Sequence, residues 1–467
     1  MSLTKLPNEL LEKIFLHLDD GEYAEQWLAY RPHNRNPTLC AVARTCRQLS
    51  KAVVPVLYAE ILFQVTGWNE EHTKRNHRRI TNLNRSCETN PSLIDEIRSV
   101  RLEFGPIASA VSKEPVKFLG HLAKSKSLTS LQIWLAPGSP GLSPLAPLLE
   151  CPVGSFLKLK DLIVNVSVLD KKDKDLSGEQ FVKLSSLPSL EHLNLSAPII
   201  GFKAPTELIL QPTKLRKLRL CPLLPVSAKA LKSVLLRSPN LESLTIGIPG
   251  DASVGHLEYF DNYLVLKEPL RPSYLGHLLS PVATSLKHLA IHATNVTFPS
   301  YDRSRINLSN FVKLETLEMT TLCLFGPPPN SDISDRPRRI WHLLLPRLER
   351  LSLNFDQQCM FWVINEASQN DIEMFWYRTN EIRRANWLLD LVDKTRRQMN
   401  TLKEIAVKDN IPEDVEFLWH NFWHLEPWSL PHSLSTAASE AGVTVTVNLA
   451  IPNEPDLSEE EDEDWEI

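Results

Sequence analysis

The amino-acid sequence predicts an α/β protein in which parallel strands and crossover helices form repeated units, preceded by a small all-helical module. Three observations predict this fold. A leucine-spaced phrase returns ten times, prolines follow most of its copies, and the first sixty residues carry helical periodicity instead. At 467 residues the chain is too long for one compact core, whereas in a repeat array each unit packs only on its neighbours.

The repeated phrase has aliphatic residues at its first, fourth and sixth positions. Its copies begin at Ile97, Leu128, Leu159, Leu190, Leu215, Leu241, Leu286, Leu314, Leu348 and Leu402. The first four begin 31 residues apart, and later intervals vary from 25 to 54 residues. Because strand side chains alternate between two faces, the aliphatics should point into the array. The variable positions should line the opposite, concave face of the sheet.

The segments between phrases predict the connections. Helices are expected at 114–125, 178–187, 227–238, 338–345 and 385–398, so each strand should run parallel to the next. Proline follows seven of the ten phrases within a few residues, and it ends strands because it lacks the N–H that a central strand donates. The alternating run at 442–450 is expected to be the final strand and to close the sheet.

Units of about 20 to 35 residues with this phrase resemble leucine-rich repeats. The resemblance implies a solenoid with a parallel sheet on the concave face and helices outside, and such an array usually holds a partner. The family's regular Asn or Cys after the third aliphatic is absent here, which leaves the repeat class and curvature open.

The first 62 residues form a different module. Leu10, Leu11, Ile14, Phe15 and Leu18 fall at helical spacing on one face. A second helix is expected in TLCAVARTCRQLS, and a third apolar segment follows in KAVVPVLYAEILF, kinked or interrupted at its proline. On spacing alone, three such helices could also be a cap that shields the first repeat.

The motif order in this module resembles an F-box over residues 4–62, in the form common in fungal proteins. It consists of Leu-Pro-x-Glu-Leu-Leu-x-x-Ile-Phe-x-x-Leu, then Cys-Arg-x-Leu, then Val-Pro-Val-Leu-Tyr. The resemblance implies docking on a Skp-type adaptor and, through it, on a cullin. The adaptor contacts that it implies are Leu6, Pro7, Leu10, Ile14, Leu18, Val42 and Cys46. The connection at 19–37 is longer than usual for the family.

Four segments are therefore expected: the helical module at 1–62, a linker and cap at 63–95, the repeat array at 96–450 and an acidic tail at 451–467. The last 14 residues hold nine acids and no base. Since 56 acidic residues less these nine leaves 47, against 51 Lys and Arg, the rest of the chain carries about +4. The tail is expected to be disordered and solvated.

Target-binding residues are expected on the concave face, where an exposed Trp is a typical hot-spot residue. The residues proposed for this role are Trp134, Lys217, Arg219, His288, His292 and Arg350. Alternatively, the loop at 137–144 covers Trp134. Two insertions, at 249–272 and 356–386, interrupt the repeats, and seven of eleven tryptophans lie between 341 and 428. That aromatic zone is either a partner pocket or the core of a C-terminal cap.

The sequence carries no phosphate-binding loop, GxSxG or HExxH motif, so neither an enzyme nor a cofactor is expected. His420 and His424 are spaced for a metal, but two ligands are too few for a closed site. The seven cysteines form no CxxC pair and are expected to be reduced packing residues. The basic clusters at 74–79 and 336–339 are short, so solvated surface is favoured over nucleic-acid contact.

These expectations combine into one function. Without a signal peptide or membrane span, the chain is expected in the cytoplasm, the nucleus or both. The two resemblances imply a non-catalytic substrate receptor of a Skp–cullin–F-box ubiquitin ligase. The main alternative is an F-box or repeat scaffold in a non-degradative complex. A ligase with its own cysteine nucleophile is disfavoured because no cysteine follows Leu402.

Overall fold

A computed structural model describes most of the chain. The described residues are 6–7, 10–11, 13–15, 37–64, 70–104, 113–135, 142, 145–150, 154–166, 175–202, 212–222, 224–250, 257–260, 263–266, 270–292, 305–324, 345–355, 386–398, 401–409, 423–427 and 429–452. Two compact units result, Met1–Leu218 and Arg219–Ile467. The acidic tail, the insertion at 356–385 and the expected helix at 338–344 lie outside the described residues.

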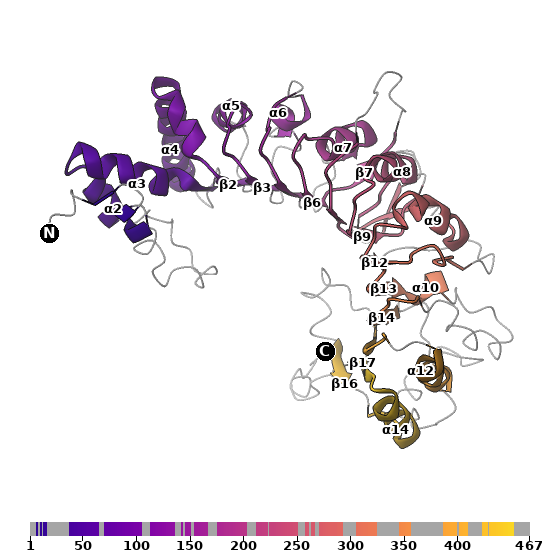
Figure 1. Cartoon of the computed structure of the whole chain (residues 1–467). Coiled ribbons are helices and arrows are strands. Elements are labelled where there is room, and N and C mark those ends of the chain that lie inside the picture. The colour runs from indigo at the N-terminus through magenta and orange to yellow at the C-terminus, as the bar shows by residue number, and fades with distance from the viewer. Residues whose placement is uncertain are drawn as a thin grey trace, which may run out of the picture. The chain divides into compact units, whose positions relative to one another are not determined.

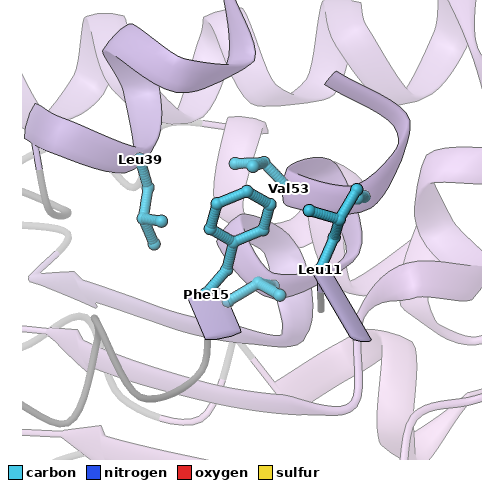
Figure 2. Close-up of a cluster of buried hydrophobic side chains, with 6 residues drawn as sticks. Leu11, Phe15, Leu39 and Val53 are labelled. Carbon is cyan, nitrogen blue, oxygen red and sulfur yellow. The ribbon is translucent and has the colours of Figure 1, made fainter. Parts of the chain in front are cut away.

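The N-terminal module is helical and has its own core. Residues 10–11 and 13–15 are helical, followed by α2 (Pro37–Ala43) and α3 (Arg47–Ala59). Leu11, Phe15, Leu39 and Val53 converge from these segments, together with two further buried residues of α3 (Figure 2). The helix α3 continues through its internal proline, so the interruption expected there is wrong.

Among the described residues, thirteen strands form one sheet, and most of them are short, as the phrase length requires. In spatial order they are β1 (Glu60–Gln64), β2 (Ser99–Phe104), β3 (Ser130–Leu135), β4 (Asp161–Val166), β6 (His192–Ser196), β8 (Lys217–Leu220), β9 (Ser243–Gly247), β12 (His288–His292), β13 (Thr316–Thr320), β14 (Arg350–Phe355), β15 (Glu404–Asp409), β17 (Thr444–Pro452) and β16 (Trp423–Pro427). Neighbours from β1 to β6 and from β9 to β17 are parallel. The architecture is therefore α/β with a long parallel sheet.

Both ends of the sheet differ from the sequence expectation. The first strand is β1, which crosses the boundary expected at residue 62 between the helical module and the linker and precedes the first phrase. The last position belongs to β16, which pairs antiparallel with β17, so the run at 442–450 does not close the sheet. Neither strand carries the phrase. Each pairs with the free edge of a neighbouring strand, and sequence periodicity does not predict such pairing.

Helices lie against one face of the sheet in each unit (Figure 1). The first unit contains α4 (Glu70–Thr89), the 3₁₀ helix η2 (Pro91–Glu96), α5 (Lys113–Leu122), α6 (Ala146–Leu149) and α7 (Gly178–Ser185). The second contains α8 (Ala228–Arg237), α9 (Pro272–Leu279), η5 (Ser280–Val282), α10 (Thr321–Leu324), α12 (Asn386–Gln398) and α14 (His432–Ala441). The expected helices at 114–125, 178–187, 227–238 and 385–398 are confirmed within a few residues at each end.

The phrase aliphatics make the core of the array. All three are buried in every copy, and none is more than 4% exposed. Burial alternates along the strands, as in β2, β3 and β4, where the intervening side chains stay partly exposed on the other face. Burying three aliphatic side chains supplies about 4 to 9 kcal/mol per repeat before conformational entropy is counted. We call the sheet face opposite the helices the open face.

Polar contacts join successive repeats at fixed positions. Just before the strands, Lys160 Nζ pairs with Glu191 Oε1 at 3.0 Å, and Lys287 Nζ pairs with Glu242 Oε2 at 3.1 Å. Exposed pairs of this kind contribute about 0 to 1 kcal/mol each. The buried Ser125 hydroxyl donates to the Ile94 carbonyl oxygen at 3.1 Å, which ties a helix end to the preceding repeat. These contacts fix the order in which repeats stack.

Two short strand pairs lie outside the main sheet. The strands β5 (Leu176–Ser177) and β7 (Ile199–Ile200) are parallel. The strands β10 (Leu257–Phe260) and β11 (Tyr263–Leu266) form an antiparallel hairpin within the first insertion. Among the described residues, no helix combines the length and apolar character that a membrane span needs.

The described cysteines are free thiols, as expected, but their burial varies. Cys87 and Cys323 are buried, two others are half-buried, and Cys46 is exposed. The expectation that all of them pack internally is therefore wrong for Cys46. It precedes α3 as its N-terminal flanking residue, which is why it does not reach the module's core.

Candidate functional site

An exposed apolar patch lies on the first helical segment of the N-terminal module. Leu10 is 46% exposed and Ile14 is 38% exposed. Pro7 is exposed as well, and its carbonyl oxygen accepts hydrogen bonds from the Leu10 and Leu11 backbone N–H groups at 3.1 Å each. Because residues three, four and seven apart share a helix face, these three side chains lie together. We call Pro7, Leu10 and Ile14 the apolar patch.

The same segment sends its other apolar side chains inward. Leu11 is fully buried and Phe15 is 3% exposed, both in the module's core (Figure 2). The sequence placed all of these residues on one face, but the structure separates them into a buried pair and an exposed set. Burial of Leu11 and Phe15 holds the segment so that the apolar patch faces solvent.

The other expected adaptor contacts fall into different environments. Leu6 and Val42 are partly buried against the module's core, while Cys46 is exposed. Leu18 lies outside the described residues. Core packing limits what Leu6 and Val42 can offer a partner, so the exposed candidates are the apolar patch and Cys46.

On the open face of the first unit, Trp134 is an exposed aromatic. It lies on β3 and is 38% exposed. The Arg101 guanidinium lies 4.9 Å from the ring centroid, and Arg101 Nη2 pairs with Glu103 Oε1 at 2.7 Å. Glu103 stands directly opposite Trp134 in the β2–β3 register. The ion pair therefore holds a cation against one side of a ring that remains partly open to solvent.

Neighbouring strands add polar and apolar positions that were not named as binding residues. Asp161 Oδ1 of β4 and His192 Nδ1 of β6 lie within hydrogen-bond distance, and both residues are partly exposed. Ile163, half-buried on the same face, stands opposite Gln132. The phrase starting at Leu159 places 161, 163 and 165 at variable positions, so the face that they occupy followed from the register.

The open face of the second unit carries a connected polar cluster. The Asn354 amide Nδ2 donates to Glu318 Oε1 at 3.0 Å and lies 3.4 Å from His292 Nδ1. Lys408 Nζ pairs with Glu318 Oε1 at 3.0 Å. Asn354 is 1% exposed, and its Oδ1 has no hydrogen-bond partner among the described residues. Of these residues, only His292 was predicted as a binding residue, although all four were expected on this face.

Charge stabilisation in this cluster centres on Glu318. Burial acts to raise the pKa of its carboxyl group. The hydrogen bonds from Asn354 and Lys408, and the charges of Lys408 and His292, outweigh that effect, so the pKa lies below its ordinary value. Glu318 is therefore ionised at neutral pH and fixes the neighbouring donors.

The remaining predicted target-binding residues also lie on open-face positions. Lys217 and Arg219 alternate with buried leucines on β8 and are exposed. His288 is half-buried and pairs in register with Ser243 and Thr316, while Arg350 is exposed at the start of β14. The phrase register predicted the face of the sheet on which these side chains lie.

Within the described ranges, no three His, Cys, Asp or Glu side chains gather as metal ligands. His420 lies outside these ranges, as does the His424 side chain. The described geometry offers a binding surface: exposed apolar side chains on one module, and aromatic, cationic and polar groups on the sheet.

Comparison with known proteins gives only distant likenesses, all among solved structures. No family model and no curated protein matches the chain. Among solved structures, the leucine-rich repeat-containing protein LegL7 from Legionella pneumophila matches at 14% sequence identity. The match covers 72% of this chain and 93% of that chain, with a TM-score of 0.31.

Proposed function

We propose that this chain is a non-catalytic substrate receptor of a Skp–cullin–F-box ubiquitin ligase. In this proposal the N-terminal module docks on the Skp-type adaptor, and the open face of the repeat sheet holds a target protein. Other subunits transfer ubiquitin. The chain contributes by raising the target's effective concentration, which requires no acid, base or nucleophile of its own.

The apolar patch is the observation that carries the proposal. A Leu and an Ile on one helix face are exposed beside a module core that accommodates their immediate neighbours. Removing apolar surface from water is favourable by about 25 cal/mol per Å². A partner that covers the apolar patch would therefore gain this free energy. Pro7, Leu10 and Ile14 are also positions that the F-box resemblance assigns to the adaptor.

The open face supports the second half of the proposal. Exposed aromatic and arginine side chains dominate protein–protein hot spots, and Trp134 with Arg101 supplies both on one strand pair. The strands beneath are fixed by the buried phrase aliphatics, so these side chains are presented on a rigid support. We infer that the target contacts include this site.

The deciding experiment compares two double variants of the whole chain. Leu10→Asp with Ile14→Asp should reduce binding of purified Skp-type adaptor at least about a hundredfold, because charge would enter an apolar interface. Leu157→Asp with Leu236→Asp changes two other exposed leucines, 52% and 61% exposed, and should bind as the parent does. Unchanged adaptor binding by the first variant would refute the F-box assignment.

Cullin recruitment separates the proposal from its alternative. If the parent protein, bound to the adaptor, also binds the cullin and supports ubiquitin transfer to a captured protein, the ligase role holds. Adaptor binding that excludes the cullin would favour a scaffold in a non-degradative complex.

A further inference from the structure

The outward face of α4 carries a dense group of basic side chains that the proposed function leaves unused. Lys74, Arg75, Arg78 and Arg85 are all exposed there. Lys74, Arg78 and Arg85 fall within a narrow sector at 100° per residue, over about 16 Å of helix. Between Glu71 and Glu88 the sequence of α4 has no acidic residue. We call Lys74, Arg75, Arg78 and Arg85 the basic face.

Packing explains why these charges point outward together. Ile80, Leu83 and Cys87 are buried on the opposite side of α4. The buried Asn84 amide Nδ2 donates to Glu114 Oε2 at 2.6 Å and to the Glu114 carbonyl oxygen at 2.9 Å, which fixes the rotation of α4 against α5. With the inner face anchored, the basic face cannot turn away from solvent.

Within the described residues, two of the charges on this face are not compensated by an ion pair. In the part of the chain that the structure describes, Arg75 and Arg78 form no ion pair. Glu88, the acid at the helix end, pairs with Lys117 Nζ at 2.7 Å, and Glu114 is held by Asn84. Burial and the charge of Arg75 lower the pKa of Arg79. Like charges three and four residues apart destabilise a helix by about 0.2 to 0.5 kcal/mol per pair.

An open depression on α4 is lined by Thr73, Lys74, His77, Arg78, Thr81, Asn82 and Arg85. Guanidinium groups present a planar fork of donors that matches a carboxylate or phosphate bidentately. An extended peptide advances about 3.3 Å per residue, so five or so residues span the basic face.

We propose that the basic face of α4 binds an acidic segment of a partner protein, through carboxylates or phosphorylated side chains. A nucleic acid fits less well, because the sequence of α4 contains no Phe, Tyr or Trp on which a base could stack. A short segment needs only the local field, within a screening length of about 8 Å.

The test uses the full chain and a labelled peptide of about ten residues, rich in Glu and Asp, with a Gln- and Asn-rich peptide as reference. Binding is followed by fluorescence anisotropy at low and at physiological salt. Arg75→Glu with Arg78→Glu should weaken binding of the acidic peptide at least about tenfold. Lys229→Glu with Lys232→Glu makes the same charge change on exposed residues of α8 and should leave affinity within about twofold.

Three further measurements keep the test decisive. Arg75→Gln with Arg78→Gln removes charge without reversing it, and it replaces the Glu variant if that variant does not fold by circular dichroism. Equal peptide affinity for the parent and the charge variants would overturn the proposal. So would single- or double-stranded nucleic acid that binds more tightly than the peptide with the same dependence on Arg75 and Arg78. Adaptor binding should be unchanged in all variants, so failure here is distinct from failure of the receptor proposal.

Discussion

The exposure of apolar side chains differs between the repeat phrases of the array and the first helical segment of the N-terminal module. In the array every phrase aliphatic is buried, and the face left to solvent is largely polar. In the module, Leu11 is fully buried while the adjacent Leu10 is 46% exposed. The difference shows that a phrase leucine in the array chiefly stabilises the fold, whereas an exposed leucine in the module is available to a partner. Each prediction below tests that distinction.

The largest effect is expected from a paired truncation. Leu289→Ala in β12 should lower the free energy of unfolding by about 2 to 5 kcal/mol, because it leaves a cavity in a closed core. Leu10→Ala should change it by no more than about 0.5 kcal/mol, since its side chain is already in water. Urea unfolding of both variants measures the difference. Comparable destabilisation by the two would erase the distinction between module and array.

Backbone packing in the array should be nearly as sensitive. A Cβ added at Gly247 in β9 would overlap the Pro222 carbonyl oxygen, and Gly247 is buried. Gly247→Ala should therefore cost about 1 to 3 kcal/mol, as overpacking does elsewhere. Gly120→Ala is the control, because nothing lies within 4 Å of a Cβ there. Unchanged stability of Gly247→Ala would mean that the backbone around Pro222 can shift at little cost.

On the open face, side-chain removal should affect binding and leave stability almost unchanged. Trp134→Ala should weaken target binding by about 2 kcal/mol or more, as a hot-spot residue does. Tyr274→Ala on α9 removes another exposed aromatic, 59% exposed, and should have no effect on target binding. Lys217→Glu with Arg219→Glu should also weaken target binding. If Trp134→Ala and the Lys217→Glu, Arg219→Glu variant both retain the target, the binding site lies off this face.

The smallest effect is expected from protonation of the polar cluster. Because the pKa of Glu318 is lowered in the folded state, its contribution to stability is present above the unfolded pKa near 4.5 and is lost as pH falls below it. Glu318→Gln should therefore be less stable than the parent at pH 6, and the gap should narrow at pH 3. Chemical denaturation at both pH values measures this. An equal stability difference between the two proteins at both pH values would show that Glu318 does not contribute to the loss of stability in acid.

The phrase predicted the array well because it encodes a local rule. Two faces alternate along each strand, so the buried aliphatics and the exposed Trp134, Lys217 and Arg219 followed from register alone. Long-range pairing was not predictable in this way. The strands β1 and β16 carry no phrase. The contact of Asp161 with His192 depends on which strands become neighbours. The division between Leu10 and Leu11 also required the structure, since both fit the helical stripe.

The antiparallel strand β16 has a consequence for solubility. A parallel array ends in a row of unpaired backbone groups that can recruit another chain of the same kind, and growth of such contacts leads to fibres. Here β16 occupies the edge of β17 and reverses direction, ending at Pro427, while helices α3 and α4 contact β1 at the opposite end. The sheet is thus terminated by strands and helices that do not continue its repeat. Stacking of two copies by continuation of the repeat is thereby disfavoured.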